Sequence, residues 1–254
     1  MTNRIAFVTG ATSGIGEATA KLLSQNNFNL ILCGRRAERL TALSKELAGH
    51  ADVFTLPFDV RNQMEVIQAI QSLPEPWKKI DVLINNAGNA HGLSAIQNGD
   101  VNDWDAMLDI NVKGLLYVSK EIMPGMVERK AGHIINIGSI AGKEVYANGN
   151  VYCASKFAVD AITQGMRIDL NLFGIKVTGI HPGMVESEFS LVRFKGDDER
   201  AKNVYKGMQP LRPADIADLI LFTLTRPHHV VLADMTIFPA AQASATVVKR
   251  ENIN

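Results

Sequence analysis

The chain contains 254 residues, of which 46% are apolar and 20% charged, and its 26 basic side chains balance its 26 acidic ones. A nucleic-acid-binding protein usually carries a basic excess, and a secretory leader or membrane span needs a longer apolar run than any in this chain. We therefore expect a cytoplasmic protein that binds neither nucleic acid nor a membrane. The two cysteines, Cys33 and Cys153, are too few for a disulfide framework or a metal cluster, so no metal site is predicted.

Apolar runs and amphipathic segments alternate along the chain. The runs predict buried strands at residues 4–9, 29–33, 53–57, 82–85, 133–137, 176–181 and 230–238. The segments between them carry apolar residues every three or four positions and predict helices at residues 15–25, 38–48, 63–73, 102–129, 152–173 and 213–225. This alternation predicts an α/β fold: one doubly wound parallel sheet of about seven strands, with helices on both faces. Ligands of such sheets bind where the strands end.

A glycine-rich turn follows the first predicted strand. It spans residues 9–16 and brings three glycines to the start of the first helix. Glycines permit a tight turn, and the free N–H groups of a helix N-terminus bind the pyrophosphate of a dinucleotide. Cofactor contacts are therefore predicted at Gly10, Thr12, Ser13, Gly14, Ile15 and Gly16. A plain helix-entry turn is the alternative, because the glycine spacing departs from the G-x-G-x-x-G pattern.

Two arginines follow the second predicted strand. Arg35 lies 19 residues after Gly16, where folds that prefer NAD place an acidic residue for the ribose hydroxyls. No carboxylate precedes Arg35 on this strand, and guanidinium groups suit a 2′-phosphate. Arg35 and Arg36 therefore predict NADP (NADPH) as the cofactor. The alternative is that both arginines belong to a solvated helix start.

Further cofactor contacts are predicted after the third and fourth strands. Asp59 and Val60 follow the third strand, where a short acceptor can meet the adenine amine. Asn86, Ala87 and Gly88 follow the fourth strand, where small residues let the backbone approach the cofactor closely. Either segment alone is unremarkable, so the prediction depends on their common position at strand ends.

A candidate proton-transfer group lies in the second half of the chain. Ser139 follows the fifth predicted strand. Tyr152 and Lys156 are one turn apart and therefore share a face of the next predicted helix. A Tyr-x-x-x-Lys pattern alone is common, and its position shortly after a strand-terminal serine is what favours a catalytic role.

Seven separated motifs resemble, in order and spacing, those of the short-chain dehydrogenase/reductase family. They are residues 9–16, residues 85–88, Asn111, Ser139, Tyr152, Lys156 and Pro182-Gly183. The resemblance covers essentially the whole chain and implies a single Rossmann-like domain over residues 1–254, with a cofactor half at about 1–138 and a catalytic and substrate half at about 139–254. It also implies a nicotinamide cofactor and four catalytic residues: Tyr152, Lys156, Ser139 and Asn111. Of these, Tyr152 and Lys156 are implied to contact the cofactor as well.

The region after the sixth strand resembles a narrower group, the NADP-dependent 3-hydroxy acid dehydrogenases. This likeness rests on residues 182–189 and 192–198, together with residues 34–36 and 149–152. It implies turnover of serine, allo-threonine, 3-hydroxypropionate or malonic semialdehyde, a substrate lid at about residues 183–210, and a homotetramer. The implied cofactor contacts here are Pro182, Gly183, Val185 and Ser187. The loop departs from the group's pattern, because it is one residue shorter and carries Glu186 in place of glycines.

Tyr152 is the predicted acid and base. A free tyrosine titrates near about 10, and a lysine ammonium at about 4 Å would lower that pKa by about 3 units at an effective dielectric of about 20. We therefore expect Lys156 to bring the pKa of Tyr152 towards neutrality. Ser139 is expected to orient the substrate oxygen. Asn111 is expected to hold a water that links Lys156 to solvent; the alternative is a structural amide that bends its helix.

The carboxylate of a 3-hydroxy acid needs a cationic partner, because an unpaired buried carboxylate is very costly. Substrate contacts are predicted from Ser139, Tyr152 and Arg193, with Arg193 binding the carboxylate from the lid. Lys195 and Lys143 are the other candidate cations. In the alternative, Arg193 only orders the lid, by pairing with Glu188, Asp197 or Asp198.

Two other functions fit the same motifs. One is a general carbonyl or 3-oxoacyl reductase of the same family. The other is a non-catalytic NADPH-binding regulatory protein, although such a protein has no reason to retain all four catalytic residues. Consumption of NADPH in the presence of a carbonyl compound separates the enzymes from the regulator.

Overall fold

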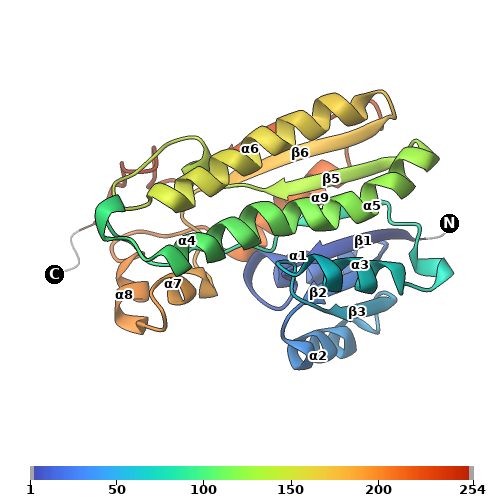
Figure 1. Cartoon of the computed structure of the whole chain (residues 1–254), viewed down its shortest axis with the longest axis horizontal. Helices are drawn as coiled ribbons and strands as arrows, with labels where there is room; N and C mark the ends of the chain where they lie inside the picture. Colours follow the sequence, from blue (N-terminus) through green and yellow to red (C-terminus); the bar gives the residue numbers. More distant parts are fainter. Residues whose placement is uncertain (1–2, 252–254) are drawn as a thin grey trace.

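The computed structural model describes residues 3–251 and arranges their seven strands in one parallel sheet (Figure 1). The strands are β1 Arg4–Thr9, β2 Phe28–Gly34, β3 Val53–Pro57, β4 Val82–Asn85, β5 Gly132–Ile137, β6 Ile175–Pro182 and β7 Asp234–Ile237. Their order is β3-β2-β1-β4-β5-β6-β7, and every neighbouring pair is parallel. The direction of winding reverses between β1 and β4, so the predicted doubly wound sheet is confirmed.

Helices cover both faces of the sheet. They are α1 Gly14–Ser24, α2 Ala37–Leu47, α3 Gln63–Gln71, α4 Val101–Leu108, α5 Leu115–Arg129, α6 Asn150–Asn171, α7 Glu188–Arg193, α8 Asp198–Asn203 and α9 Pro213–Leu224. The apolar side chains of α3, α5 and α6 form the core on one face, and those of α1, α2 and α9 form the core on the other. In Figure 1, α5 and α6 run side by side in front of the sheet. No helix within residues 3–251 is long and apolar enough to cross a membrane.

The continuous apolar runs of the sequence are explained by these two cores. Successive side chains of a strand point to opposite faces, so a strand covered on both faces needs an apolar residue at every position. On β1, Phe7 enters the core with α3, α5 and α6, while Ala6 and Val8 enter the core with α1 and α9. All three are fully buried. The burial of a Phe or Val side chain stabilises the fold by roughly 1.5–3 kcal/mol.

Three predictions about the elements need correction. The last strand begins at Asp234 rather than at residue 230, because it pairs only with the end of β6 and the preceding Val231 is exposed. The helix predicted at residues 102–129 is interrupted by a π-helical segment, Asp109–Gly114, between α4 and α5. Two short helices, α7 and α8, lie in the predicted lid, where no helix was predicted.

Candidate active site

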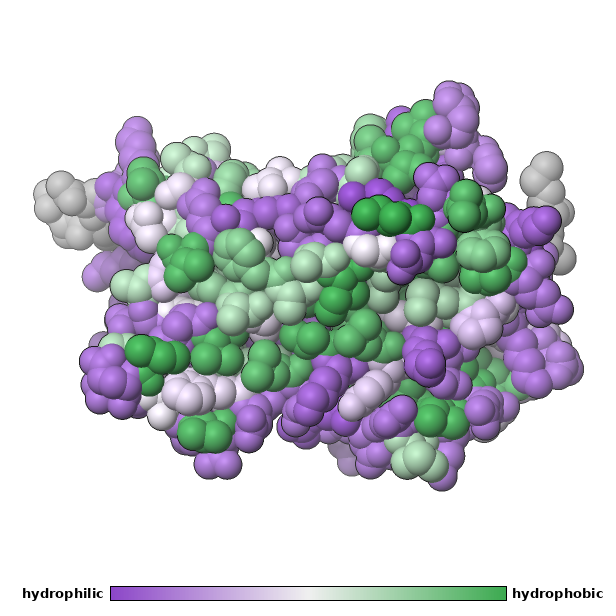
Figure 2. All heavy atoms as spheres, turned by 45° about the horizontal axis from the view of Figure 1, so that its top comes forward, coloured by the Kyte–Doolittle hydropathy of each residue, from purple (hydrophilic) through white to green (hydrophobic). Residues whose placement is uncertain are grey.

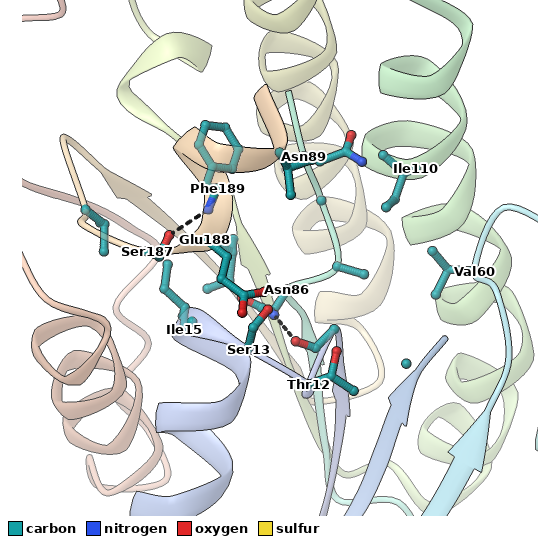
Figure 3. A pocket seen from close by; sticks show the side chains of 18 of the residues that line it. Thr12, Ser13, Ile15, Val60, Asn86, Asn89, Ile110, Ser187, Glu188 and Phe189 are labelled. Carbon is teal, nitrogen blue, oxygen red and sulfur yellow. Dashed lines mark hydrogen bonds between the residues drawn. The ribbon is translucent and has the colours of Figure 1, made fainter. Parts of the chain in front are cut away.

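A cavity of about 320 Å³ opens at the carboxyl ends of the strands. Figure 3 shows its lining, with side chains from the loops after β1, β3 and β4 on one side and from α7 on the other. The predicted cofactor and catalytic residues that line it are Gly10, Thr12, Ser13, Gly14, Ile15, Arg35, Arg36, Asp59, Val60, Asn86, Ala87, Gly88, Ser139, Tyr152, Lys156, Pro182, Gly183, Val185 and Ser187. Three predicted site residues lie outside this lining, namely Gly16, Asn111 and Arg193.

The glycine-rich turn is held tightly against the loop after β4. Gly10 and Gly14 have φ angles of 65° and 56°, a left-handed conformation that side chains disfavour. The hydroxyl of Thr9 accepts hydrogen bonds from the backbone N–H groups of Asn86 and Ala87, both at 2.9 Å. Gly16 packs beneath the turn, where a Cβ atom would lie 2.4 Å from the carbonyl oxygen of Gly10. The turn therefore presents the start of α1 to the cavity, and Gly16 acts through packing.

Arg35 and Asp59 form the side of the cavity beyond β2 and β3. Arg35 is 57% exposed, and its nearest acidic partner is Asp59, with the two charged groups 3.9 Å apart. The Asp59 carboxylate is instead held by Arg61, a residue that the sequence did not single out, at 2.7 Å. Burial opposes ionisation of Asp59, but Arg61 outweighs it, so the pKa of this carboxyl is lowered. Arg35 therefore keeps its hydrogen-bond donors open to solvent and the cavity.

Helix α6 brings Tyr152 and Lys156 to the wall of the cavity. Both side chains are buried, with 8% and 6% exposure. The ammonium of Lys156 donates to the carbonyl oxygen of Ile137, 3.0 Å away at the end of β5. Ser139 follows β5, and its hydroxyl accepts from the backbone N–H of Ala141 at 3.1 Å. The structure thus brings three of the four predicted catalytic residues together.

The predicted effect of Lys156 on Tyr152 needs correction. Burial is the largest influence on the Tyr152 hydroxyl and raises its pKa, with the nearby phenol of Tyr146 acting in the same direction and Ser139 in the opposite one. Burial also lowers the pKa of the Lys156 ammonium to about 8. Desolvation disfavours the charged form of each group. Tyr152 is therefore a protonated phenol at neutral pH.

Asn111 lies in the π-helical segment, behind the cavity. Its side-chain amide donates to the carbonyl oxygen of Asn89 at 2.8 Å and to the hydroxyl of Ser155 at 3.0 Å, and its oxygen accepts from the backbone N–H of Asn89 at 2.9 Å. The amide thus ties the helix to the loop after β4 and to α6. π-Helical turns are frequent at functional sites, because they redirect one side chain out of the helical register.

Arg193 lies at the end of α7, beside Tyr152 but outside the main cavity. Its guanidinium donates to the carbonyl oxygen of Gly92 at 3.2 Å and to the hydroxyl of Tyr146 at 2.9 Å. It also lies over the Tyr152 ring, 5.5 Å from the ring centroid. The expected pairs with Glu188, Asp197 or Asp198 do not form, and no carboxylate within residues 3–251 lies in salt-bridge distance of Arg193. Arg193 and Tyr152 share the wall of a second, smaller cavity with His91.

The other two candidate cations are already paired. Lys195 lies 3.0 Å from the carboxylate of Asp103. Lys143 bridges the carboxylates of Asp160 and Asp234, at 2.9 and 2.6 Å. The ligand atoms of Asp160, Asp234 and the buried His181 lie within 4.8 Å of one another, a spacing that could hold a metal ion. Since Lys143 already bridges both carboxylates, its ammonium supplies the positive charge that a metal would bring.

Some of the residues that line the cavity were not predicted from the sequence. The additional lining residues are Cys33, Gly34, Phe58, Asn89, Ile110, Ile137, Gly138, Glu188, Phe189 and Val192. Most of them are neighbours of predicted residues at strand ends, so the strand ends themselves were a usable signal. Glu188, Phe189 and Val192 belong to α7, and no helical pattern was recognised there.

The donor set of the main cavity fits a phosphorylated dinucleotide. The start of α1 supplies backbone N–H groups that favour anions. Arg35 supplies an open guanidinium at the far side. The buried ammonium of Lys156 and the phenol of Tyr152 stand at the end of the cavity where β5 and β6 finish.

Comparisons with known proteins agree with this geometry. A family model described as short chain dehydrogenase matches residues 4–197. The chain is 46% identical over 242 residues to the NADP-dependent 3-hydroxy acid dehydrogenase YdfG of Salmonella typhi, covering 95% of this chain and 97% of that protein. It is 42% identical over 249 residues to sulfoacetaldehyde reductase 2 of Chromohalobacter salexigens, covering 97% and 99%. A closed serine dehydrogenase complexed with NADP+ superimposes with a TM-score of 0.91 at 42% identity, covering 98% of this chain and all of that one.

Proposed function

The chain belongs to the short-chain dehydrogenase family and is an NADP-dependent oxidoreductase, and we propose that it moves a hydride between nicotinamide and a small 3-hydroxy acid or 3-oxo acid. Serine, allo-threonine, 3-hydroxypropionate and malonic semialdehyde are the substrates we would test first. Support comes from the relatives named 3-hydroxy acid dehydrogenase and from the serine dehydrogenase of closely similar fold.

The observation that carries the substrate proposal is the position of Arg193. Its guanidinium lies over the ring of Tyr152 and has no carboxylate partner within residues 3–251. A partly buried cation beside the acid/base residue favours a substrate with an anionic group close to the reacting carbon. The carboxylate of a 3-hydroxy acid meets this requirement.

The proposed chemistry divides between the cofactor and three side chains. NADP, when bound, accepts or supplies the hydride. Tyr152 gives a proton to the substrate oxygen in the reduction direction and takes it back in the oxidation direction. Ser139 orients the substrate oxygen through its hydroxyl. Lys156 places a positive charge behind the phenol, which favours the phenolate that forms when Tyr152 gives up its proton.

Asn111 is the fourth residue of the proposed catalytic group, and it lies behind the cavity. Its amide holds the carbonyl of Asn89 and the hydroxyl of Ser155, so it supports both the cofactor loop and the helix that carries Tyr152. We propose that a water held near this amide passes protons between Lys156 and solvent. The proposed cofactor site consists of the predicted cofactor residues that line the main cavity and of Gly16 beneath it. We place the 2′-phosphate beside Arg35 and Arg36.

A second candidate substrate class is the small aldehyde sulfonates. The relative from Chromohalobacter salexigens is named sulfoacetaldehyde reductase, and its identity to this chain is similar to that of the hydroxy acid dehydrogenases. A guanidinium binds carboxylate and sulfonate oxygens in the same way. A general carbonyl reductase, by contrast, would have no use for an anion-binding arginine.

The substrate proposal is tested with Arg193→Ala. KM for a 3-hydroxy acid should rise roughly 10- to 100-fold, which is the effect of losing a charged hydrogen bond. Activity on an uncharged aldehyde of similar size should change little. Arg200→Ala is the matched control, because Arg200 lies in the same lid but over the Phe194 ring. Equal losses on charged and uncharged substrates would overturn the anion site. Failure to consume NADPH with any carbonyl compound would favour a regulatory protein.

We also propose a homotetramer. Figure 2 shows apolar side chains gathered in a band across the face that carries α5 and α6. The exposed apolar residues on these two helices include Leu116, Phe157 and Ile168, the last 75% exposed. Exposed apolar patches of this kind mark protein interfaces. Light scattering should give four times the 27.7 kDa mass of the chain, and Ile168→Asp should lower the measured mass.

A further inference from the structure

Glu188 connects the lid to the cofactor turn. It is the first residue of α7, and its two carboxylate oxygens accept hydrogen bonds from two different arginines, Arg36 at 2.9 Å and Arg39 at 2.8 Å. The two arginines lie about 150 residues earlier in the chain, at the start of α2. In Figure 3 the Glu188 side chain reaches from α7 towards Ser13 and Thr12. The three residues Glu188, Arg36 and Arg39 are called the clasp below.

The guanidinium of Arg36 donates its hydrogen bonds to other residues of the chain. Its Nη2 donates to the hydroxyls of Ser13 at 2.8 Å and Thr12 at 2.9 Å, its Nε donates to the same Thr12 hydroxyl, and its Nη1 donates to Glu188. Arg39 reaches the carbonyl oxygen of Thr12 with the same Nη1 that binds Glu188. Arg35 makes no comparable bonds within residues 3–251 and has only the 3.9 Å contact with Asp59. The adjacent arginines therefore serve different partners.

The clasp holds one end of α7, and Arg193 holds the other. Between them, the Phe189 ring packs against the Tyr152 ring, with centroids 5.6 Å apart. Ser187, which precedes the helix, caps it by accepting from the backbone N–H of Phe189. The position of α7 over Tyr152 thus depends on contacts made at the cofactor turn as well as on contacts made at the substrate side.

The Glu188 carboxyl of the clasp is ionised at neutral pH. The hydrogen bond from Arg36 is the largest influence on the Glu188 carboxyl, and it lowers the pKa of this group, with Arg39 adding to the effect. The clasp side chains are between 42% and 49% exposed, so solvent can enter and the clasp can open without unfolding the sheet. Partly exposed ion pairs of this kind each contribute little stability, so they can break and re-form.

We propose that Glu188 is a positioning residue that closes the substrate lid by binding Arg36 and Arg39, and that Arg35 is left as the arginine that hydrogen-bonds the 2′-phosphate of NADP. Arg36 still contributes positive charge near the phosphate, but its hydrogen bonds order the cofactor turn and connect it to α7. The lid therefore closes only onto a turn in which Thr12 and Ser13 are already in place for the cofactor. This inference rests on the proposed lid and cofactor site, but not on which acid is the substrate.

The negative charge of Glu188 determines the direction in which its removal should change NADPH affinity. The Glu188 carboxylate lines the cofactor cavity, so it repels the phosphates of a bound dinucleotide. Removal of this charge should leave NADPH affinity unchanged or improve it, whereas loss of the clasp should free the lid. If Glu188 served only to orient Arg36 for the phosphate, its removal would weaken NADPH binding and leave the lid unaffected. The two roles thus predict opposite results.

Glu188→Gln in the full chain tests the proposal, with Glu186→Gln as the matched control. Glu186 lies on the same loop, loses the same charge on substitution, and has no side-chain hydrogen bond or ion pair within residues 3–251. NADPH affinity is measured by cofactor fluorescence. Lid opening is measured as the rate of trypsin cleavage after Arg193 and Lys195 in the NADPH-bound protein, identified by mass spectrometry. Neither measurement uses the substrate, so a failure of the substrate proposal leaves both informative.

Cleavage in Glu188→Gln should be about tenfold faster than in the wild type, because proteolysis follows the population of the open lid, while NADPH affinity should not fall. Arg39→Gln should reproduce this increase, and the double variant Glu188→Gln with Arg39→Gln should add nothing further. Glu186→Gln should behave as the wild type. The proposal is overturned if Glu188→Gln is cleaved no faster than Glu186→Gln, or if its NADPH affinity falls about fivefold or more with the lid unchanged.

Discussion

The two walls of the cavity are built by different kinds of contact. The proposed cofactor wall consists of turns that directly follow strands, and its geometry depends on left-handed glycines such as Gly10 and on backbone N–H groups that donate to the buried Thr9 hydroxyl. The proposed substrate wall consists of α7, which is held at one end by the Glu188 side chain and at the other by the Arg193 side chain and by a backbone hydrogen bond from Gly92 to the carbonyl of Arg193. The cofactor wall is therefore continuous with the sheet, whereas α7 is attached to the rest of the fold by contacts at its two ends.

This difference suggests how the two walls respond to change. A wall of turns that continue directly from buried strands stays in place when one exposed side chain is replaced. A wall held by partly exposed ion pairs and single hydrogen bonds can move, because each such contact contributes little alone. We therefore expect substitutions in the cofactor wall to alter chemistry or cofactor choice at constant structure, and substitutions in the lid to alter lid position.

The largest effect is expected for Tyr152→Phe, which tests whether the chemistry belongs to the fixed wall. The substitution removes the hydroxyl that we propose to carry the proton and keeps the ring that packs against Phe189. Turnover should fall by about 10²- to 10⁴-fold, the usual contribution of a general acid or base. NADPH affinity and thermal stability should stay near the wild-type values. Steady-state kinetics and cofactor fluorescence provide the check, and residual kcat above about a tenth of wild type would point to another acid.

Arg35→Ala is expected to have the next largest effect and to separate the two adjacent arginines. Loss of a charged hydrogen bond to the 2′-phosphate should lower kcat/KM for NADP about 10- to 100-fold and leave NAD turnover unchanged. Arg36→Ala should reduce the preference for NADP less and should also open the lid. Kinetics with both cofactors measure the first effect, and trypsin cleavage measures the second. Identical behaviour of the two variants would contradict the division of roles.

Lys156→Met tests how much the fold is destabilised by burying the ammonium that we propose to be catalytic. Burial lowers the pKa of Lys156 from 10.5 to about 8, so the unfolded chain binds this proton more tightly than the folded one. The charged Lys156 therefore destabilises the folded state fully below pH 8, and this destabilisation is lost as the pH rises towards 10.5. The variant should be more stable than the wild type at pH 7 by about 1–3 kcal/mol. Denaturant unfolding at pH 7 and pH 10 measures the difference, which should shrink at the higher pH.

The smallest effect is expected for Tyr205→Phe, which loosens the lid without touching the cavity. The Tyr205 hydroxyl donates to the carbonyl oxygen of Val185 at 2.8 Å and lies 2.7 Å from the hydroxyl of Ser190. Its loss should raise the substrate KM about two- to tenfold, in line with about 0.5–1.5 kcal/mol for a neutral hydrogen bond. NADPH affinity should not change. Tyr117→Phe on α5 is the control, and an equal rise in KM there would remove the assignment to the lid.

The sequence predicted the cofactor wall well for a physical reason. The turn at residues 9–16 and the pair Tyr152 and Lys156 are local patterns, and their geometry follows from the strand or helix that contains them. Nineteen predicted residues therefore lie around one cavity, although their roles stay predictions. The prediction for the Tyr152 pKa was wrong, because it counted the charge of Lys156 and not the burial of both groups.

The sequence by itself determined the parallel sheet, the position of its carboxyl edge and the residues that meet there, because apolar runs, glycine turns and helical spacing act over a few neighbouring residues. Only the tertiary structure decided which charges pair. Lys143 was a candidate for the substrate but bridges Asp160 and Asp234, the latter 91 residues away. Glu188 was one of the alternative partners considered for Arg193 but binds Arg36, 152 residues away. Long, flexible charged side chains pair with whatever opposite charge the folded loops bring near, and no local pattern encodes that partner.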